Sequence, residues 1–286
     1  MNSGDTNPHG ISRRAFAASS LVAGFTLAAG PLRAGTIVTD ANGLVAGEVR
    51  VPTGDGVIPA WRARPASGAR WPVVLVTQEI FGVHEHIRDI CRRFAKQGAY
   101  AIAPSLYARY GDPAPYTDMH KLVADIVSKV PDAGVMSDLD AAVKFAAGEG
   151  ADTARLAIIG FCWGGRIVWL YAARNPRLKA GAAFYGQLRG PVPPNPLRPL
   201  YPLDLAAKLN PPVLGFYGGK DQGIPLSDVE AMRAALAVAG KLDSRIDVFM
   251  DSGHGFFADY RPSYNETDAK PAWARTLQWF RQHDAM

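Results

Sequence analysis

Short apolar runs alternate with amphipathic segments along most of this 286-residue chain, and this alternation restricts the folds that the chain can adopt. The apolar runs lie at 72–76, 99–103, 156–159, 180–184, 213–217 and 246–250. The segments with helical periodicity lie at about 84–97, 118–130, 133–148, 164–174, 226–239 and 267–283. Nearly continuous apolar strands separated by helices are typical of a parallel sheet that is covered on both faces. The sequence therefore predicts an α/β fold with a mostly parallel central sheet and helices on both faces.

The part of the chain before the first apolar run has a different pattern. Residues 47–51 and 57–64 alternate between apolar and polar side chains, and the turn-forming segment 52–56 separates them. This pattern predicts a hairpin and therefore an antiparallel N-terminal start to the sheet. The segment 190–202 contains six prolines and has no periodicity, so we interpret it as a loop within one domain, residues 35–286.

Residues 1–34 have the features of an export signal. Arg13 and Arg14 form a twin-arginine pattern, a Gly- and Ala-rich apolar run follows at 17–30, and a peptidase could cut after Ala34. The apolar run is too short to be a stable membrane span. We predict a signal peptide cleaved near Ala34, recognition by the twin-arginine export machinery and a periplasmic location. A disordered tail and an uncleaved anchor are the alternatives.

Charge and motif content argue against several classes of partner and cofactor. The chain has 31 Lys and Arg against 26 Asp and Glu, and the basic residues are scattered, which argues against a nucleic-acid-binding surface. No glycine-rich phosphate loop is present, so we predict no nucleotide cofactor. His84 and His86 are two positions apart on a predicted helix, where side chains diverge, and no third ligand is evident. We therefore predict no metal.

The two cysteines occupy different sequence contexts, which argues against a disulfide between them. Cys91 lies on the apolar face of the predicted helix 84–97, as a small core residue would. Cys162 lies between a predicted strand and a predicted helix, in the pattern Gly-x-Cys-x-Gly-Gly. Small neighbours allow a sharp turn that lifts the side chain above the sheet, and a helix N-terminus favours a thiolate. Taken alone, the motif also fits an ordinary glycine-rich turn with a buried thiol.

Asp221 and His254 each follow the end of a later apolar run. The order nucleophile, acid, histidine is that of the α/β-hydrolase triad. In such a triad His254 would accept the proton of Cys162, and Asp221 would hold the imidazole in the correct tautomer. The backbone N–H groups of Ile80, after the first apolar run, and of Trp163, after the nucleophile, are the candidates for an oxyanion hole.

Over about residues 45–283, these motifs together resemble dienelactone hydrolase (carboxymethylenebutenolidase), the cysteine branch of the α/β-hydrolases. The motifs are 79–82, 107–109, 160–165, Asp221 and 252–256. The resemblance implies the α/β-hydrolase fold and a catalytic triad of Cys162, His254 and Asp221. It also implies that Glu79 shares a proton or a hydrogen bond with the resting thiol and that Arg275 pairs with Glu79.

One part of the chain departs from the family pattern. Dienelactone enzymes carry a further arginine, upstream of the stretch that corresponds here to 133–139, which binds the substrate carboxylate. The segment 116–130 contains no arginine and offers His120 and Lys121 instead. We take these two residues and Arg109 as candidates for substrate binding. Because Lys does not reproduce the bidentate fork of Arg, the substrate could be a neutral or differently shaped ester or lactone.

The sequence therefore predicts a hydrolase of small esters or lactones that acts through a thioester on Cys162. Two alternatives stay open. An acyltransferase or another thiol hydrolase could use the same residues, and a non-catalytic binding protein could retain the hydrolase scaffold without turnover.

Overall fold

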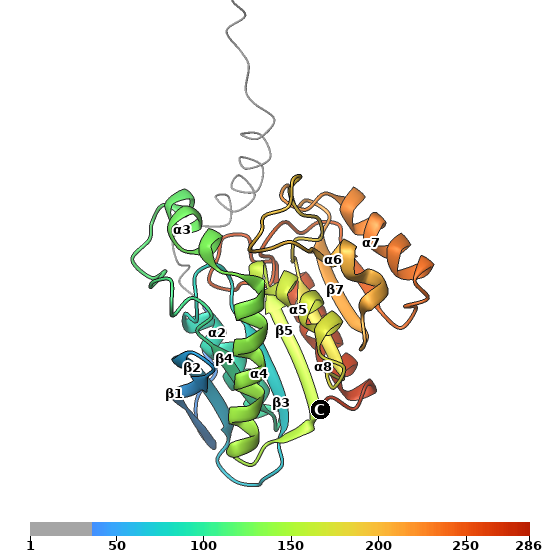
Figure 1. Cartoon of the computed structure of the whole chain (residues 1–286). Coiled ribbons are helices and arrows are strands. Elements are labelled where there is room, and N and C mark those ends of the chain that lie inside the picture. The colour runs from blue at the N-terminus through green and yellow to red at the C-terminus, as the bar shows by residue number, and fades with distance from the viewer. Residues whose placement is uncertain (1–35) are drawn as a thin grey trace, which may run out of the picture.

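The computed structural model of the protein describes residues 36–286 (Figure 1). The predicted signal peptide, residues 1–34, lies outside the described residues. Residues 36–286 form one eight-stranded sheet with the strand order β1-β2-β4-β3-β5-β6-β7-β8. Within this described part, no helix combines the length and apolar character needed to cross a membrane.

The strands confirm the predicted α/β architecture with an antiparallel start. Two strands form the N-terminal hairpin, and six more follow: β1 Leu44–Thr53, β2 Gly56–Pro65, β3 Pro72–Thr77, β4 Tyr100–Pro104, β5 Asp152–Phe161, β6 Ala180–Phe184, β7 Val213–Gly218 and β8 Arg245–Phe249. β2 pairs antiparallel with β1 and β4, whereas the pairs from β4 through β3 to β8 are parallel. β3, β6 and β7 are buried along their whole length, which explains their uninterrupted apolar sequences.

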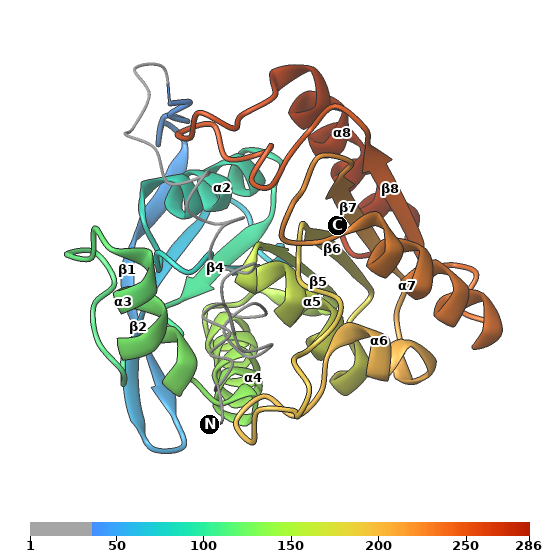
Figure 2. The ribbon, with the colours of Figure 1, turned by 90° about the horizontal axis from the view of Figure 1, so that it is seen from above.

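Helices cover both faces of this sheet. Their bounds are α2 Glu85–Lys96, α3 Met119–Asp125, α4 Asp132–Gly148, α5 Trp163–Arg174, α6 Pro202–Leu205, α7 Leu226–Val238 and α8 Glu266–Gln282. α4 and α5 lie on one face, and α2 and α8 lie on the other (Figures 1 and 2). The carboxyl ends of the parallel strands consequently meet at one edge, where the loops that follow them can bring distant residues together.

Two segments differ from the predicted elements. The helix expected at 118–130 ends at Asp125, and a short 3₁₀ turn follows at Val127–Lys129. Ile126 leaves the helical conformation and is buried, as Val127 is, so core packing outweighs the local periodicity. The proline-rich loop leads into α6, which the sequence did not indicate; there the Tyr201 N–H donates to the Asp204 carboxylate at 2.8 Å.

Candidate active site

Cys162 lies in a strained turn between β5 and α5. Its backbone has φ 56° and ψ −115°, a conformation that residues with a side chain rarely adopt. Gly164 in the next turn has no room for a larger residue, because a Cβ atom there would lie 2.5 Å from the carbonyl oxygens of Thr77 and Gln78. The turn therefore packs α5 directly against the end of β3 and presents the Cys162 thiol at the carboxyl edge of the sheet.

The three predicted triad residues share one buried environment. His254 Nδ1 lies 2.8 Å from Asp221 Oδ2, and Cys162 acts electrostatically on the same imidazole. The other carboxylate oxygen of Asp221 accepts from the backbone N–H groups of Gly223 at 2.9 Å and Ile224 at 3.1 Å. Both oxygens of this carboxylate are thus fixed, and the orientation of the His254 ring follows from them.

The surroundings of His254 favour its protonated form. Burial opposes the charged imidazolium, but the negative charges of Asp221 and Cys162 outweigh burial and raise the pKa of His254 to about 10. The imidazole is therefore protonated at neutral pH. A positive charge on His254 is the kind of neighbour that activates a nucleophilic sulfur.

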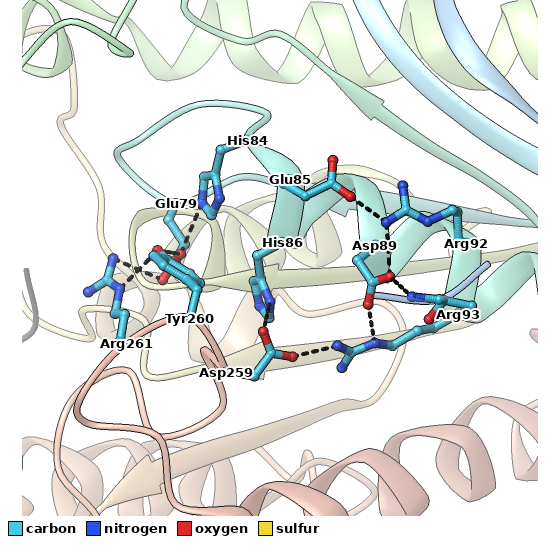
Figure 3. Close-up of polar contacts among 11 residues, drawn as sticks. Glu79, His84, Glu85, His86, Asp89, Arg92, Arg93, Asp259, Tyr260 and Arg261 are labelled. Atoms are coloured by element: carbon cyan, nitrogen blue, oxygen red, sulfur yellow. Dashed lines mark hydrogen bonds and ion pairs between the residues drawn. The ribbon is translucent and has the colours of Figure 1, made fainter. Parts of the chain in front are cut away.

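Glu79 follows β3 and is completely buried. Its Oε2 atom accepts from the Tyr260 hydroxyl at 2.5 Å and lies 3.3 Å from His84 Nε2, and its Oε1 atom lies 3.4 Å from Arg261 Nη2 (Figure 3). Burial acts to raise the pKa of this carboxyl. The charge of Arg261 and the hydrogen bond with His84 outweigh burial and hold the pKa of Glu79 well below its ordinary value. Glu79 is therefore ionised.

The predicted pairing of Arg275 with Glu79 is wrong. Arg275 lies on α8, its side chain is 44% exposed, and its Nη1 atom bonds Asp247 Oδ2 at 2.8 Å. The partner of Glu79 is Arg261, which is buried in the loop that carries His254. The sequence held one usable signal, because a basic residue seven positions after His254 lies in a loop that must pass close to the nucleophile.

A hydrogen bond between Glu79 and the resting thiol stays a prediction. Among the described residues, the side chains that contact the Glu79 carboxylate are Tyr260, His84 and Arg261. Glu79 and Cys162 nevertheless share one electrostatic environment. Burial first, then the charge of Glu79 and more weakly that of Cys162, raise the pKa of the buried Tyr185 phenol well above its ordinary value.

The two candidate oxyanion donors are the backbone N–H groups of Ile80 and Trp163. Within residues 36–286, neither N–H group donates a hydrogen bond. Trp163 is the first residue of α5, where helix geometry leaves the N–H without an intrahelical acceptor. Ile80 lies in the tight β3–α2 connection, which the hydrogen bond from Gly82 N–H to Glu79 O closes at 3.3 Å. These two N–H groups are available to an oxyanion beside Cys162, and this role stays a prediction.

The three candidates for substrate binding lie apart from the triad. Arg109 donates to Asp138 at 2.7 Å and to Asp55 at 2.7 Å, at the wall of a cavity of about 260 Å³ between the β1–β2 hairpin and α4. Two carboxylates thus already neutralise its charge. His120 and Lys121 are exposed on α3. Within residues 36–286, none of the three contacts the triad, so their role in substrate binding stays a prediction.

Aromatic side chains that the sequence analysis did not select surround the nucleophile. The Tyr185 ring lies edge-on to His254 with 5.0 Å between ring centroids, and Tyr107 lies 5.1 Å from Trp163 in the same way. Both tyrosines are fully buried and directly follow or lie near the carboxyl ends of β6 and β4. The signal in the sequence was a tyrosine shortly after an apolar strand. The rings of Tyr107 and Tyr185 keep the surroundings of the charged site residues apolar.

Comparisons with known proteins agree with this geometry. The model of the dienelactone hydrolase family matches residues 58–284. A candidate carboxymethylenebutenolidase of Methylorubrum extorquens is 58% identical over 275 residues, which are 96% of this chain and 94% of that protein. A candidate 2-oxo-3-(5-oxofuran-2-ylidene)propanoate lactonase of Bradyrhizobium is 31% identical over 225 residues, 78% of this chain and 89% of that protein. The crystal structure of a candidate dienelactone hydrolase from Klebsiella pneumoniae superimposes with a TM-score of 0.81 at 52% identity, covering 84% of this chain and 99% of that one.

Proposed function

Because this chain belongs to the dienelactone hydrolase family, whose members hydrolyse lactones and esters, we propose that it cleaves a small ester or lactone by nucleophilic attack of Cys162. The observation that carries the proposal is the Asp221–His254 hydrogen bond in one electrostatic environment with the Cys162 thiol, which a strained turn holds. A thiol at a helix N-terminus beside an imidazolium is arranged as a nucleophile.

In the first half of the reaction the sulfur of Cys162 forms a bond to the substrate carbonyl carbon. The carbonyl π electrons move onto oxygen, and the N–H groups of Ile80 and Trp163 receive the resulting oxyanion. Collapse of this intermediate breaks the carbon–oxygen bond of the ester. The leaving oxygen takes the proton of His254, and the acyl group is left on Cys162 as a thioester.

In the second half a water molecule hydrolyses the thioester. His254, now neutral, accepts a proton from the water as its oxygen attacks the thioester carbonyl carbon. The carbon–sulfur bond then breaks, the sulfur of Cys162 leaves with the electron pair, and the carboxylic acid product is released. Asp221 stabilises the imidazolium that forms again, so the overall reaction adds one water to one ester or lactone bond.

We propose that Glu79 controls this reaction electrostatically. A neutral carboxyl in the same buried environment favours negative charge on the sulfur, so Glu79 favours attack when it takes up the thiol proton of Cys162. In the structure Arg261 and Tyr260 hold the Glu79 carboxylate, which corresponds to a resting state in which this proton transfer is disfavoured. A substrate that strengthens or loosens this hold would change the reactivity of the thiol.

The test is a panel of lactones and aryl esters with the purified protein, in parallel with Cys162→Ala and the matched control Cys91→Ala. We expect hydrolysis by the wild type and by Cys91→Ala, and none by Cys162→Ala. Acid quenching during turnover, followed by intact-mass and peptide analysis, should give an acyl adduct on Cys162. Hydrolysis that survives Cys162→Ala would contradict the mechanism, and substrate binding without an adduct or turnover would favour the binding-protein alternative.

We also propose that the chain is exported to the periplasm by the twin-arginine route. Its support is the paired Arg13 and Arg14, followed by the apolar run at 17–30. Replacing both with lysine should leave the protein in the cytoplasm, because a receptor reads the arginine pair and lysine lacks its planar fork. Cell fractionation measures this, with Arg33→Lys as the control. Normal export of the double variant would contradict the proposal.

A further inference from the structure

His84 connects the buried carboxylate of Glu79 to the protein surface. It lies immediately before α2, its Nε2 atom is 3.3 Å from Glu79 Oε2, and its side chain is 24% exposed whereas that of Glu79 is fully buried. The His84 ring packs edge-on against Tyr260, with 4.8 Å between ring centroids, and against Phe81 at 6.2 Å (Figure 3). The imidazole is therefore held in place beside the carboxylate while one side of it meets solvent.

We propose that His84 is a positioning residue whose own protonation sets how firmly Glu79 is held away from reaction. This inference rests on the proposed role of Glu79 in controlling Cys162. A neutral His84 can donate one hydrogen bond from Nε2 to the carboxylate. A protonated His84 adds a second positive charge beside the one on Arg261, which binds the Glu79 carboxylate more tightly and makes it a weaker base.

The groups that face His84 come from each neighbouring element. Glu79 faces it from the end of β3, His86 from the first turn of α2 at 6.1 Å between ring centroids, and Tyr260 and Arg261 from the loop after β8. Burial acts most strongly to lower the pKa of His84, and the hydrogen bond and charge of Glu79 oppose it. The charges of His86 and Arg261 add to the lowering, and the net pKa of His84 lies below its ordinary value.

Of His84, Arg261 and Tyr260, His84 is the residue whose charge changes as the pH falls, because its pKa lies below the ordinary value of histidine. Arg261 stays charged at all pH values relevant to proteins. Burial and the charge of Glu79 keep Tyr260 neutral, because both raise the pKa of its phenol well above the ordinary value. As the pH falls through the lowered pKa of His84, the imidazolium forms and Glu79 becomes pinned. Activity should therefore decline on the acidic side.

His86 offers a matched control because it is similar in chemistry but has different partners. Its Nδ1 atom lies 3.2 Å from Asp259 Oδ1, and Asp259 Oδ2 accepts from Arg93 Nη2 at 2.5 Å (Figure 3). These contacts fasten α2 to the loop that carries His254, and they do not involve Glu79. Replacing His86 therefore perturbs the same region without removing the His84–Glu79 contact.

The first experiment measures kcat/KM from about pH 5 to 8 for the wild type, His84→Gln, His84→Ala and His86→Gln. Gln retains a donor that does not titrate. At the pH where kcat/KM is highest, we expect His84→Gln to lie within about twofold of the wild type. At the lowest pH, this variant should retain a fraction of its own maximal kcat/KM that is about 3- to 10-fold larger than the fraction that the wild type retains. His84→Ala should lose plateau activity that Gln restores, and His86→Gln should keep an acidic decline, moved toward higher pH because the charge of His86 lowers the pKa of His84. The same decline in wild type and His84→Gln, or equal plateaus for Gln and Ala, would overturn the proposal.

The second experiment needs no turnover. NMR titration of the His84 ring in the wild type and in Glu79→Gln compares its pKa with and without the carboxylate. Because Glu79 favours the imidazolium, we expect a lower pKa of His84 in Glu79→Gln. An unchanged pKa of His84 in the folded variant would overturn the coupling. If the pKa of His84 depends on Glu79 but the protein shows no hydrolysis that requires Cys162, the result would contradict the proposed function and not the coupling of His84 to Glu79.

Discussion

The two cysteines of this protein are equally buried and yet have very different surroundings. Cys91 is 0% exposed and Cys162 is 2% exposed, and both are free thiols. Cys91 lies on the inner face of α2 with its sulfur 4.0 Å from the Trp61 carbonyl oxygen, and burial raises its pKa far above the ordinary value. Cys162 instead shares a buried environment with His254, whose positive charge Asp221 supports. Burial alone makes a thiol inert, whereas burial beside a fixed cation prepares it for attack.

The largest effect is expected from removing the thiol of Cys162, which lies near His254. Cys162→Ala should lower kcat/KM by about 10⁴-fold or more, because no other group can form the thioester. Cys91→Ala should stay within about twofold of the wild type, since its sulfur contacts only the core. Initial rates of ester hydrolysis measure both. Equal losses in two folded variants would remove the distinction between the two thiols.

The next effect tests which arginine belongs to the Cys162 environment. Arg261→Gln leaves the buried Glu79 carboxylate without its cation and should cost about 3–5 kcal/mol of unfolding free energy. Arg275→Gln breaks an exposed pair with Asp247 and should cost about 1 kcal/mol or less. Urea unfolding curves give both values. If the two variants are equally stable, the assignment of Arg261 to the buried site is wrong.

A smaller effect concerns Glu79, the buried carboxylate that we propose controls the reaction of Cys162. No such role is proposed for a carboxylate near Cys91. Glu79→Gln should lower the rate about 10²-fold, in the range of a general acid–base contribution. It should also change the alkylation rate of Cys162, because the charge beside the thiol is gone. Ester hydrolysis and alkylation between about pH 5 and 9 measure these effects. A variant that matches the wild type in both would make Glu79 an ordinary strand-end carboxylate.

The smallest effect is on the structural thiol. Cys91→Ser places a hydroxyl in the apolar interior and should cost about 1–3 kcal/mol of stability, because burying a polar group with a poor partner is unfavourable. Its kcat/KM should be unchanged. Thermal unfolding together with rates measures this, and Cys91→Ala provides the comparison without a polar group. A large loss of activity with intact stability would show that Cys91 also takes part in the reaction.

The sequence by itself determined the strands, their parallel character and the positions of the triad residues. Each of these follows from local patterns, because a fully buried strand must be apolar along its length. The sequence predicts that Cys162, Asp221 and His254 lie together, because each comes just after the carboxyl end of a parallel strand and these ends meet at one edge of the sheet. Covalent order and strand topology were sufficient for that step.

Only the tertiary structure decided which charged side chains pair. Arg261 binds Glu79 and Arg275 does not, and Asp55 and Asp138 neutralise Arg109 from distant parts of the chain. The paths of irregular loops set such contacts, and loops have no periodicity that a sequence pattern can reveal. The early end of α3 has the same origin, since burial of Ile126 depends on what surrounds it and not on its neighbours in sequence.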